Sequence, residues 1–361
     1  MELHPTHISL SGRQVRIETL LQQTSGTSGW EKSWLDFLVE WYNDRDFIEV
    51  QTSGSTGTPK TIRMNKDFVA ASARRTIQFF ALKENDRVLH CLPSKYIAGK
   101  LMIVRALIGK LDLHVVDPAT NFSFPTQEPF KFAAMVPNQV AKLLEFVPPP
   151  ADWNPDCTRT PFGRLEFLLI GGSAIPALLE EKLQGCQTAC YSSYAMTETA
   201  THIALRKLNG TDASDFYHCL DDIEVELSKA GCLQIKMPGL EKPLQTNDLA
   251  ELRDHKTFQI LGRADNVVIS GGIKFSPEQL EKKLELHIKQ PFMISWLPHE
   301  TLGQQLILIV EGSQTPEKTK QMEAVVQNHL DKFERPREIR FVKQIPRTPN
   351  GKIDRRSIHR D

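Results

Sequence analysis

The residues best suited to chemistry lie in one stretch of glycine, serine and threonine between residues 52 and 60. Gly54 and Gly57 let the backbone turn its amide groups toward an anion without a side chain in the way. The hydroxyl side chains around them add donors, and Lys60 adds a positive charge. This composition predicts a loop for the β- and γ-phosphates of ATP, although its spacing is not that of the Walker loop and a flexible linker is the alternative. The candidate phosphate-binding residues are Thr52, Ser53, Gly54, Ser55, Thr56, Gly57 and Lys60.

Apolar runs typical of strands alternate with amphipathic runs typical of helices from residue 30 to residue 192. Such alternation predicts a mainly parallel sheet covered by helices. Short strand patterns between residues 223 and 262 then predict a small antiparallel β unit. The expected strands are 47–51, 87–92, 113–116, 132–136, 167–170 and 188–192, and the expected helices are 30–42, 67–82, 99–108, 138–146 and 176–183.

The C-terminal part of the chain reads as a separate α+β domain, with strand patterns at 267–269, 305–311 and 338–342 and a helix over 316–333. Another helix is expected to begin at Pro277, with Ser276 as its cap. The sequence therefore predicts an α/β fold in two domains. The large N-terminal domain, 1–263, carries the sheet and the small β unit, and the small mobile α+β C-terminal domain is 264–361.

Composition narrows the class of protein. Lys plus Arg and Asp plus Glu each number 44 among 361 residues, so the net charge is zero, which disfavours nucleic acid as a partner. The N-terminus lacks a secretory signal, and the most apolar stretch, 101–111, is interrupted by Arg105 and Lys110, whereas a membrane helix needs about 20 apolar residues. The six cysteines form no CxxC pair, which is typical of reduced thiols. We expect a cytoplasmic protein without integral membrane contact, for which a homo-oligomer stays open.

The loop and four later segments resemble signatures of the adenylate-forming superfamily, which contains acyl-CoA synthetases, adenylation domains and luciferases. Residues 52–60 match the family's phosphate loop throughout. The other similar segments follow in the family's order. They are Tyr194-Ala195-Met196-Thr197-Glu198-Thr199, Thr246-Asn247-Asp248, residues 262–278 and residues 346–352.

The resemblance implies a role for each matched residue. Tyr194 would stack on adenine, Thr197 would touch the α-phosphate, and Glu198 would hold Mg²⁺. Asp248 would accept hydrogen bonds from the ribose hydroxyls, and Arg263 would support the same ribose. Taken singly, each of these residues is more often a core, capping or solvated side chain, so the inference depends on the ordered set.

The resemblance also implies a reaction in two steps. A carboxylic acid attacks the α-phosphorus of ATP and expels pyrophosphate, with Lys352 reaching the α-phosphate and the acid. The C-terminal domain then rotates about Asp265, and the segment containing Gly271 and Gly272 guides coenzyme A to the acyl-AMP. The implied cofactors and partners are therefore ATP, Mg²⁺, coenzyme A and a small carboxylic acid.

The chain departs from the family pattern in three places. Only about fifty residues precede the phosphate loop, Tyr96 stands where the family has histidine, and Ala195 and Asn247 replace glycines. The short form, with the run 201–206, is similar to the o-succinylbenzoate–CoA ligases of menaquinone synthesis.

An o-succinylbenzoate molecule has two carboxylates, and only one is activated, so a cation or donor must hold the other. The candidates are Lys100, His202 and Arg206. The alternatives are a packed core position for His202 and an exposed helix end for Arg206. Gly171 and Gly172 resemble the family's acyl-site glycines, or form a plain strand-to-helix turn.

Two other functions stay open at this point. An aryl- or fatty-acyl-AMP ligase would pass the acyl group to a carrier protein, and Gly271 and Gly272 permit a coenzyme A path without requiring one. A non-catalytic nucleotide-binding relative would keep the fold and lose the reactive groups, but the matched residues retained here argue against it.

Overall fold

The computed structural model describes residues 2–51, 61–120, 122–145, 162–347 and 353–355. The chain divides into two compact units. The first unit is Met1–Ile175 with Leu179–Ile223, and the second unit is Pro176–Leu178 with Glu224–Asp361. Each unit is built around its own strands.

The first unit contains a mainly parallel sheet in the strand order β11-β10-β9-β8-β7-β5-β6-β1-β2. Strands β9, β8, β7, β5, β6 and β1 run parallel to one another, whereas β10 and β2 join β9 and β1 antiparallel and β11 joins β10 antiparallel. A separate antiparallel hairpin, β3–β4, carries the predicted phosphate loop between its strands. The bounds are β1 His7–Leu10, β2 Arg13–Arg16, β3 Phe47–Gln51, β4 Thr61–Asn65, β5 Arg87–His90, β6 Asp112–Val115, β7 Phe130–Met135, β8 Leu165–Ile170, β9 Ala189–Ala195, β10 His202–Lys207 and β11 Tyr217–Cys219.

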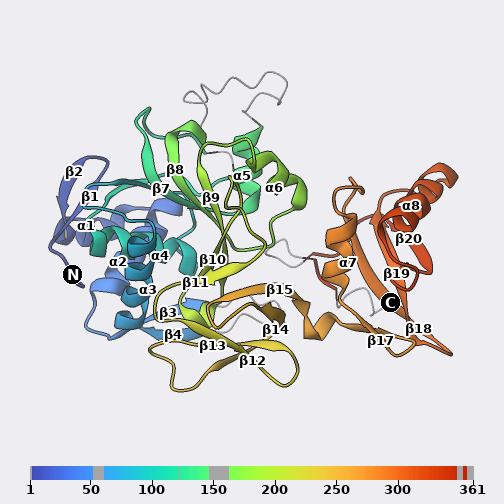
Figure 1. The fold of residues 1–361 in the computed structure, drawn as a ribbon. Helices are drawn as coiled ribbons and strands as arrows, with labels where there is room; N and C mark the ends of the chain where they lie inside the picture. The colour runs from blue at the N-terminus through green and yellow to red at the C-terminus, as the bar shows by residue number, and fades with distance from the viewer. Residues whose placement is uncertain (1, 52–60, 121, 146–161, 348–352, 356–361) are drawn as a thin grey trace. The chain divides into compact units, whose positions relative to one another are not determined.

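Helices cover both faces of this sheet, which explains why its central strands are almost wholly apolar. On one face Phe80, which follows α3, contacts Phe132 of β7 and Phe167 of β8. On the other face Val140 of α5 and Leu168 of β8 belong to one buried cluster. Figure 1 shows the course of these helices and strands. The bounds are α1 Ile17–Gln23, α2 Gly29–Tyr42, α3 Lys66–Phe79, α4 Ile97–Gly109, α5 Pro137–Leu144 and α6 Ala177–Leu183.

Helix α4 is buried on every side from Gly99 to Ile108, as a helix without a polar face must be. It contacts α2, α3, β5 and β6. Its position at the centre of the first unit matters for the site, because Lys100 and Arg105 both lie on it.

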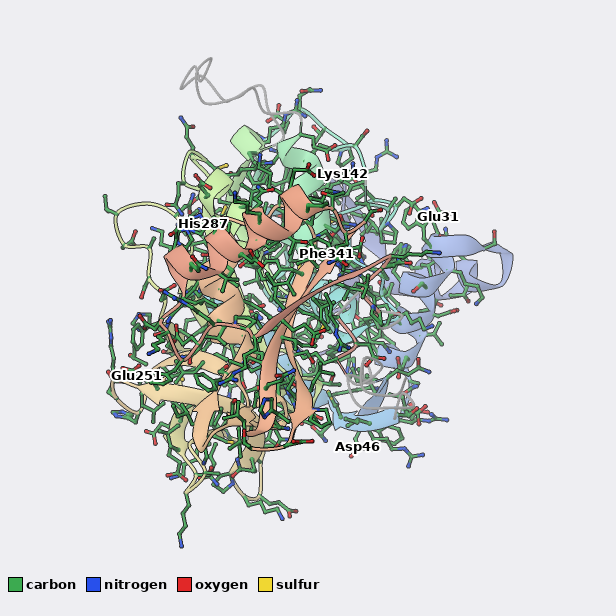
Figure 2. All side chains as sticks on the ribbon, turned by 90° about the vertical axis from the view of Figure 1, so that its right-hand side faces the viewer. Glu31, Asp46, Lys142, Glu251, His287 and Phe341 are labelled. Atoms are coloured by element: carbon green, nitrogen blue, oxygen red, sulfur yellow. The ribbon has the colours of Figure 1, made fainter. Side chains whose placement is uncertain are left out.

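The second unit contains an antiparallel four-stranded β unit and an α+β part. The α+β part has the strand order β17-β16-β19-β18, with β20 parallel to β19. Its core gathers apolar side chains of β16, β18, β19, α7 and α8, with Phe341 of β20 against it (Figure 2). The bounds are β12 Glu224–Leu227, β13 Cys232–Lys236, β14 Leu244–Leu252, β15 Thr257–Arg263, β16 Val268–Ser270, β17 Ile273–Phe275, α7 Pro277–Leu284, β18 Phe292–His299, β19 Gly303–Glu311, α8 Pro316–His329 and β20 Glu338–Val342.

The α/β class predicted from the sequence is confirmed, and the predicted elements overlap the observed ones. The prediction missed the short strands β1, β2, β4, β10, β11 and β17 and the longer strand β18. Helix α7 begins at Pro277 with Ser276 in the N-cap position, as expected, but the side chain of Ser276 makes no capping hydrogen bond. The hydroxyl of Ser276 donates to the carbonyl of Leu261 at 2.8 Å and to the carboxylate of Glu278 at 3.1 Å instead of capping the helix.

The two compact units divide the chain after Ile223. The domain boundary expected after residue 263 therefore stays a prediction, and so does the mobility of the C-terminal domain. Within the described parts of the chain, no helix combines the length and hydrophobicity that crossing a bilayer requires. The five cysteines described in the structure are free thiols, and Cys157 lies outside the described residues.

Candidate functional site

The predicted phosphate loop, residues 52–60, lies outside the described residues, and so does Lys352. The two residues that flank the loop are described. Gln51 ends β3, Thr61 begins β4, and the two are partners across the hairpin. The hairpin therefore brings the start and the end of the predicted loop together.

The adenine and metal candidates lie at the carboxyl end of β9, the place where open parallel sheets bind ligands. Tyr194 is half-buried there, with its ring centroid 6.0 Å from that of Tyr217. Thr197 and Glu198 belong to the short turn Thr197–Thr199, which ends at Ala200 with φ at +64°. A positive φ at a non-glycine residue costs free energy, and such strain is typical of functional turns.

The two predicted acyl-site glycines follow strand β8, which pairs with β9. Gly171 follows β8, and a Cβ atom placed on it would lie 2.3 Å from the hydroxyl of Ser193, next to Tyr194. Gly172 adopts φ of +88°, which favours glycine. The structure therefore brings Gly171 against Ser193 of β9, and both glycines lie in the connection from β8 to α6, as the alternative of a strand-to-helix turn expects.

Glu198 suits a magnesium ion that is held mainly by phosphate oxygens. Its side chain is exposed, and no hydrogen bond or ion pair joins its carboxylate to another described residue. No group of three or more His, Cys, Asp or Glu side chains in the described ranges could hold a metal ion. Mg²⁺ ordinarily uses one or two carboxylates, substrate phosphates and water, so a single free carboxylate fits that ion.

The ribose candidates form a network across two strands of the second unit. Asp248 of β14 and Arg263 of β15 are partners in register, and their side chains form an ion pair at 3.2 Å. Arg263 also pairs with Asp265 at 2.9 Å, and Asn247 donates to both oxygens of Asp265 at 3.2 Å. The structure therefore joins the predicted ribose pair to the predicted hinge residue through one set of charge-assisted hydrogen bonds.

Gly271 and Gly272 form the two-residue loop between β16 and β17, in which Ser270 pairs with Ile273. Their φ angles are +58° and +83°, as a type I′ hairpin turn requires. The hairpin by itself explains both glycines, and their contact with coenzyme A stays a prediction.

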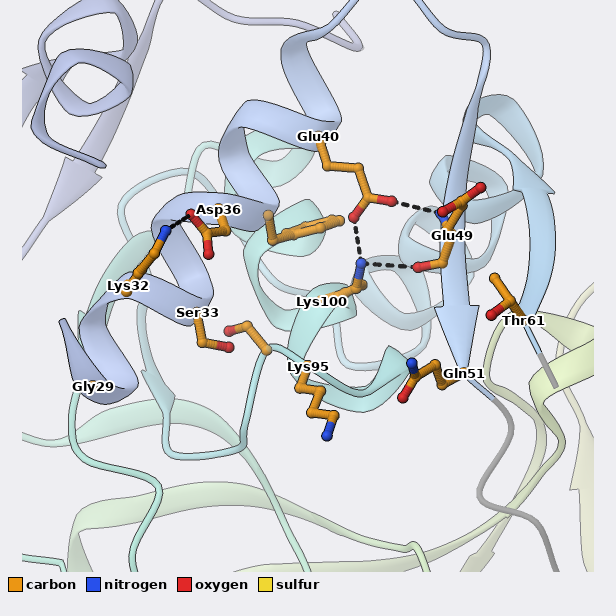
Figure 3. A pocket seen from close by; sticks show the side chains of 12 residues that line it. Gly29, Lys32, Ser33, Asp36, Glu40, Glu49, Gln51, Thr61, Lys95 and Lys100 are labelled. Atoms are coloured by element: carbon orange, nitrogen blue, oxygen red, sulfur yellow. Dashed lines mark hydrogen bonds and ion pairs between the residues drawn. The ribbon is translucent and has the colours of Figure 1, made fainter. Parts of the chain in front are cut away.

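Lys100 was expected to hold a substrate carboxylate, and the structure pairs it within the protein (Figure 3). Its side chain, 9% exposed, forms an ion pair with Glu40 of α2 and donates to the carbonyl of Glu49 in β3 at 3.0 Å. Its ammonium lies 4.8 Å from the ring centroid of Phe37. The side chain lines a pocket of about 500 Å³ that Gln51 and Thr61 also line, but its charge is already satisfied.

We expect Lys100→Met alone to lower the free energy of unfolding by roughly 3 kcal/mol, because Glu40 would keep a half-buried charge without its partner. The double variant Lys100→Met/Glu40→Leu should recover most of that loss. Urea unfolding of the two single variants and the double variant measures the coupling. Lys32→Met is the matched control in the same pocket, since its ion pair with Asp36 is about half exposed and should contribute less than about 1 kcal/mol. An equal loss in both methionine variants would contradict the buried pairing.

His202 and Arg206 do not offer a free charge either. His202 is 3% exposed, 3.2 Å from the hydroxyl of Thr76, and burial lowers its pKa well below the usual value, so the ring is neutral in the core. Arg206 lies on strand β10 rather than at a helix end, and its guanidinium pairs with Glu180 and Asp215. His202 therefore has the packed core position that was the alternative, without a positive charge, and the charge of Arg206 is compensated by protein carboxylates.

Arg105, which the sequence analysis did not select, is a described cation that is fully buried and forms no ion pair with a described acid. Its side chain on α4 is 2% exposed, and no described carboxylate pairs with it. One guanidinium nitrogen donates to the sulfur of Met102 at 3.3 Å, Nε has no partner among the described residues, and the ring of Phe132 is 5.8 Å away. Burial lowers the pKa of Arg105 to about 9, so it is still charged at neutral pH. An arginine inside the most apolar stretch of the chain was the signal that could have found it.

His90 is a second buried group near these elements. It ends β5, is 2% exposed, and lies 2.9 Å from the hydroxyl of Ser94, while its Nδ1 has no partner in the described part of the chain. Burial lowers the pKa of His90 to about 4. The ring is therefore neutral across the physiological range, and its low pKa makes it a weak base at pH 7.

This depressed pKa predicts how stability depends on pH. The unfolded chain binds a proton at His90 near pH 6.5, and the folded protein binds it only near pH 4. The contribution of His90 to the free energy of unfolding should therefore be complete above pH 6.5, and about 3 kcal/mol of it should be lost as the pH falls toward 4. Urea unfolding of His90→Gln across this range should give a flatter curve, whereas a variant of the exposed His218 should keep the wild-type slope. Parallel curves for wild type and His90→Gln would contradict the assignment.

Comparison with models of known protein families identifies the class of protein. A model of AMP-binding enzymes matches residues 18–223, and a model of the AMP-binding enzyme C-terminal domain matches residues 297–352. The chain belongs to the family of AMP-binding enzymes, so the expected class, an adenylate-forming acyl-CoA ligase, is confirmed.

Several relatives share nearly the whole chain. A solved acyl-CoA synthetase (AMP-forming)/AMP-acid ligase II-like protein from Dyadobacter fermentans is 32% identical and superimposes with a TM-score of 0.60, over 93% of this chain and 96% of its own. The 2-succinylbenzoate–CoA ligase of Lactococcus lactis is 25% identical over 86% of this chain and 70% of its own. The O-succinylbenzoate coenzyme A synthetase of Bacillus subtilis, solved with ATP and magnesium, shares the fold at 19% identity and a TM-score of 0.68, over 95% of this chain and 82% of its own.

Proposed function

We propose that this enzyme activates o-succinylbenzoate with ATP and transfers the acyl group to coenzyme A, as a step of menaquinone biosynthesis in the cytoplasm. The family membership, the ordered motifs and relatives that carry this activity in their names support the proposal. The observation that carries the choice of acid is Arg105, a buried guanidinium with no carboxylate partner in the described chain.

A buried charge that nothing compensates is unfavourable, so its presence in a well-packed core needs a reason. An acid with a second carboxylate supplies one, because a guanidinium binds a carboxylate through two parallel hydrogen bonds. Lys100 and Arg206 are each paired with a protein acid, and His202 is neutral. Arg105 therefore replaces the three earlier candidates as the proposed partner of the carboxylate that is not activated.

The chain's other residues would organise the reacting anions. We assign the triphosphate to residues 52–60, adenine to Tyr194, the α-phosphate to Thr197 and the ribose to Asp248 and Arg263. Mg²⁺, held by Glu198, would supply charge neutralisation between the phosphates. Lys352 would hold the carboxylate against the α-phosphate during the first step, and rotation of residues 264–361 about Asp265 would then admit coenzyme A past Gly271 and Gly272.

Pyrophosphate release from ATP, measured with o-succinylbenzoate, benzoates and fatty acids in turn, tests the proposed substrate. The expected result is release with o-succinylbenzoate that exceeds the others by at least tenfold in kcat/KM, followed by thioester formation when coenzyme A is added. Preference for a benzoate or a fatty acid would reject this acid. Acyl transfer to a carrier protein but not to coenzyme A would reject the acceptor, and ATP binding without pyrophosphate release would reject catalysis itself.

A further inference from the structure

The segment expected to act as the hinge is tied to the β unit that precedes it. This segment is the short turn Ala264–Asn266, which follows β15 and carries Asp265. Asn247 of β14 donates to both carboxylate oxygens of Asp265 at 3.2 Å, and Arg263 reaches the same carboxylate at 2.9 Å. The side chain of Asp265 is therefore held from β14 and β15, the two strands that carry the proposed ribose residues.

A second contact spans the turn. The hydroxyl of Ser276, just before α7, donates to the carbonyl of Leu261 in β15 at 2.8 Å. A Cβ atom on Gly262, whose φ is +146°, would lie 2.2 Å from that hydroxyl and 2.7 Å from the carboxylate of Glu278. Glycine thus lets the start of α7 lie directly against β15. Because Leu261 precedes Asp265 and Ser276 follows it, this hydrogen bond joins the two sides of the expected pivot.

Asn247 is one of the positions at which the chain departs from the family pattern. The family has glycine there, and glycine has no side chain that could reach Asp265. An amide that donates to a carboxylate makes a charge-assisted hydrogen bond, and two such bonds favour one orientation of the carboxylate. The restraint from Asn247 is therefore an addition to the family pattern.

Rotation about Asp265 would have to break these contacts. A hinge moves by changing φ and ψ at a few residues, so side chains that are bonded across it oppose the change. The contacts of Asn247 with Asp265 and of Ser276 with Leu261, together called the hinge clasp, therefore stabilise the present arrangement over a rotated one.

We propose that Asn247 and Ser276 are positioning residues, which through the hinge clasp set the balance between the two orientations of residues 264–361. The inference rests on the proposed function, in which this part of the chain rotates between acyl-AMP formation and thioester formation. Since each orientation serves one step, a weaker clasp shifts the population toward one half-reaction at the expense of the other. The ratio of the two rates therefore reports on the clasp.

Two assays on the full chain measure that ratio. The first follows acid-dependent pyrophosphate release, and the second follows thioester formation from supplied acyl-AMP and coenzyme A. Asn247→Ala and Ser276→Ala should each shift the ratio about three- to tenfold and in the same direction, because both open the same clasp. Asn247→Asp should shift it further in that direction, since it sets a second carboxylate against Asp265.

Gln245→Ala is the matched control for Asn247→Ala. Gln245 is also an exposed amide of β14, but its side chain accepts a hydrogen bond from Gln234 of β13 at 2.8 Å. Its removal should leave the ratio within about twofold of wild type. Equal losses in both half-reactions would show a merely structural role and overturn the inference. An unchanged ratio, opposite shifts in the two clasp variants, or an equal shift in the control would overturn it as well.

Hydrogen exchange without substrate gives a measurement that does not depend on activity. The amides of residues 264–276 should exchange faster in Asn247→Ala than in wild type, while those of β18 should be unchanged. Unaltered exchange at the hinge would also overturn the inference. A wild-type enzyme that releases no acid-dependent pyrophosphate would reject the proposed function, and hydrogen exchange would still decide whether the clasp holds the hinge.

Discussion

Arg105→Met is expected to stabilise the folded protein and at the same time abolish most activity toward o-succinylbenzoate. Arg105 is a buried cation without an acid among the described residues, so its replacement by an apolar side chain of similar length removes an unfavourable charge. Replacing buried charges by apolar groups is often neutral or stabilising, and we expect a gain of about 1 kcal/mol or more. The measurement is urea unfolding without substrate.

The same substitution should lower kcat/KM for the dicarboxylic acid strongly. Loss of one partner of a buried charge pair costs about 2–5 kcal/mol, which corresponds to roughly a thirty-fold to several-thousand-fold decrease. An acid with a single carboxylate, such as benzoate, makes no such pair, so its slow reaction should change little. Arg105→Lys should retain part of the activity, because it keeps the charge and loses the two-pronged geometry.

Arg206→Met provides a contrasting control within the same unit. Arg206 is also largely buried, but Glu180 compensates its charge, so its removal should lower stability where removal of Arg105 raises it. An equal loss of activity of Arg105→Met toward both classes of acid, or a clear loss of its stability, would contradict the proposed role of Arg105.

Gly99→Ala is expected to cost about 3 kcal/mol or more of folding stability. A Cβ atom on Gly99 would lie 2.3 Å from the carbonyl oxygen of Pro93, 2.6 Å from its carbonyl carbon and 2.9 Å from the Cα atom of Ser94. These are backbone atoms, so either α4 or the loop before it must move. Lys100 and Arg105 lie on the same helix, and activity should therefore fall together with stability.

Gly109→Ala is the matched control for Gly99→Ala, because it makes the same chemical change at the other end of α4. The Cβ atom would meet side-chain atoms of Leu111 and Ile77 at 3.0–3.1 Å, and flexible side chains can adjust. Alanine also has the higher helix propensity, so the change should be within about 1 kcal/mol. Comparable losses in the two variants, measured by thermal and urea unfolding, would refute the explanation from the Pro93 contact.

Local pattern in the sequence predicted much of the fold. The central strands of the parallel sheet are mostly apolar, as in β8, and α3 has a clear helical period, so neighbouring residues alone carried the signal. The prediction missed the longer strands β4, β10 and β18, and it failed as well at β1, β2, β11 and β17, which are only three or four residues long. Such strands are too short to show a period, and their pairing partners, not their own composition, make them strands.

The candidate site, like the fold, was predicted only in part from the sequence. The class of enzyme followed from ordered motifs, because phosphate loops, turns and hairpins need particular residue types at fixed spacing. The choice among buried cations did not follow, since it depends on residues distant in the chain: Glu40 pairs with Lys100, and Glu180 pairs with Arg206. Arg105 differs from these in having no acid beside it, which no sequence pattern records.

The sequence by itself therefore determined the family, the α/β class and the set of residues available for chemistry. The tertiary structure decided which of those residues carry an uncompensated charge and which are held in place by others. The physical reason is that backbone geometry follows from neighbouring residues, whereas the free energy of a charge follows from burial and from partners that only folding brings near.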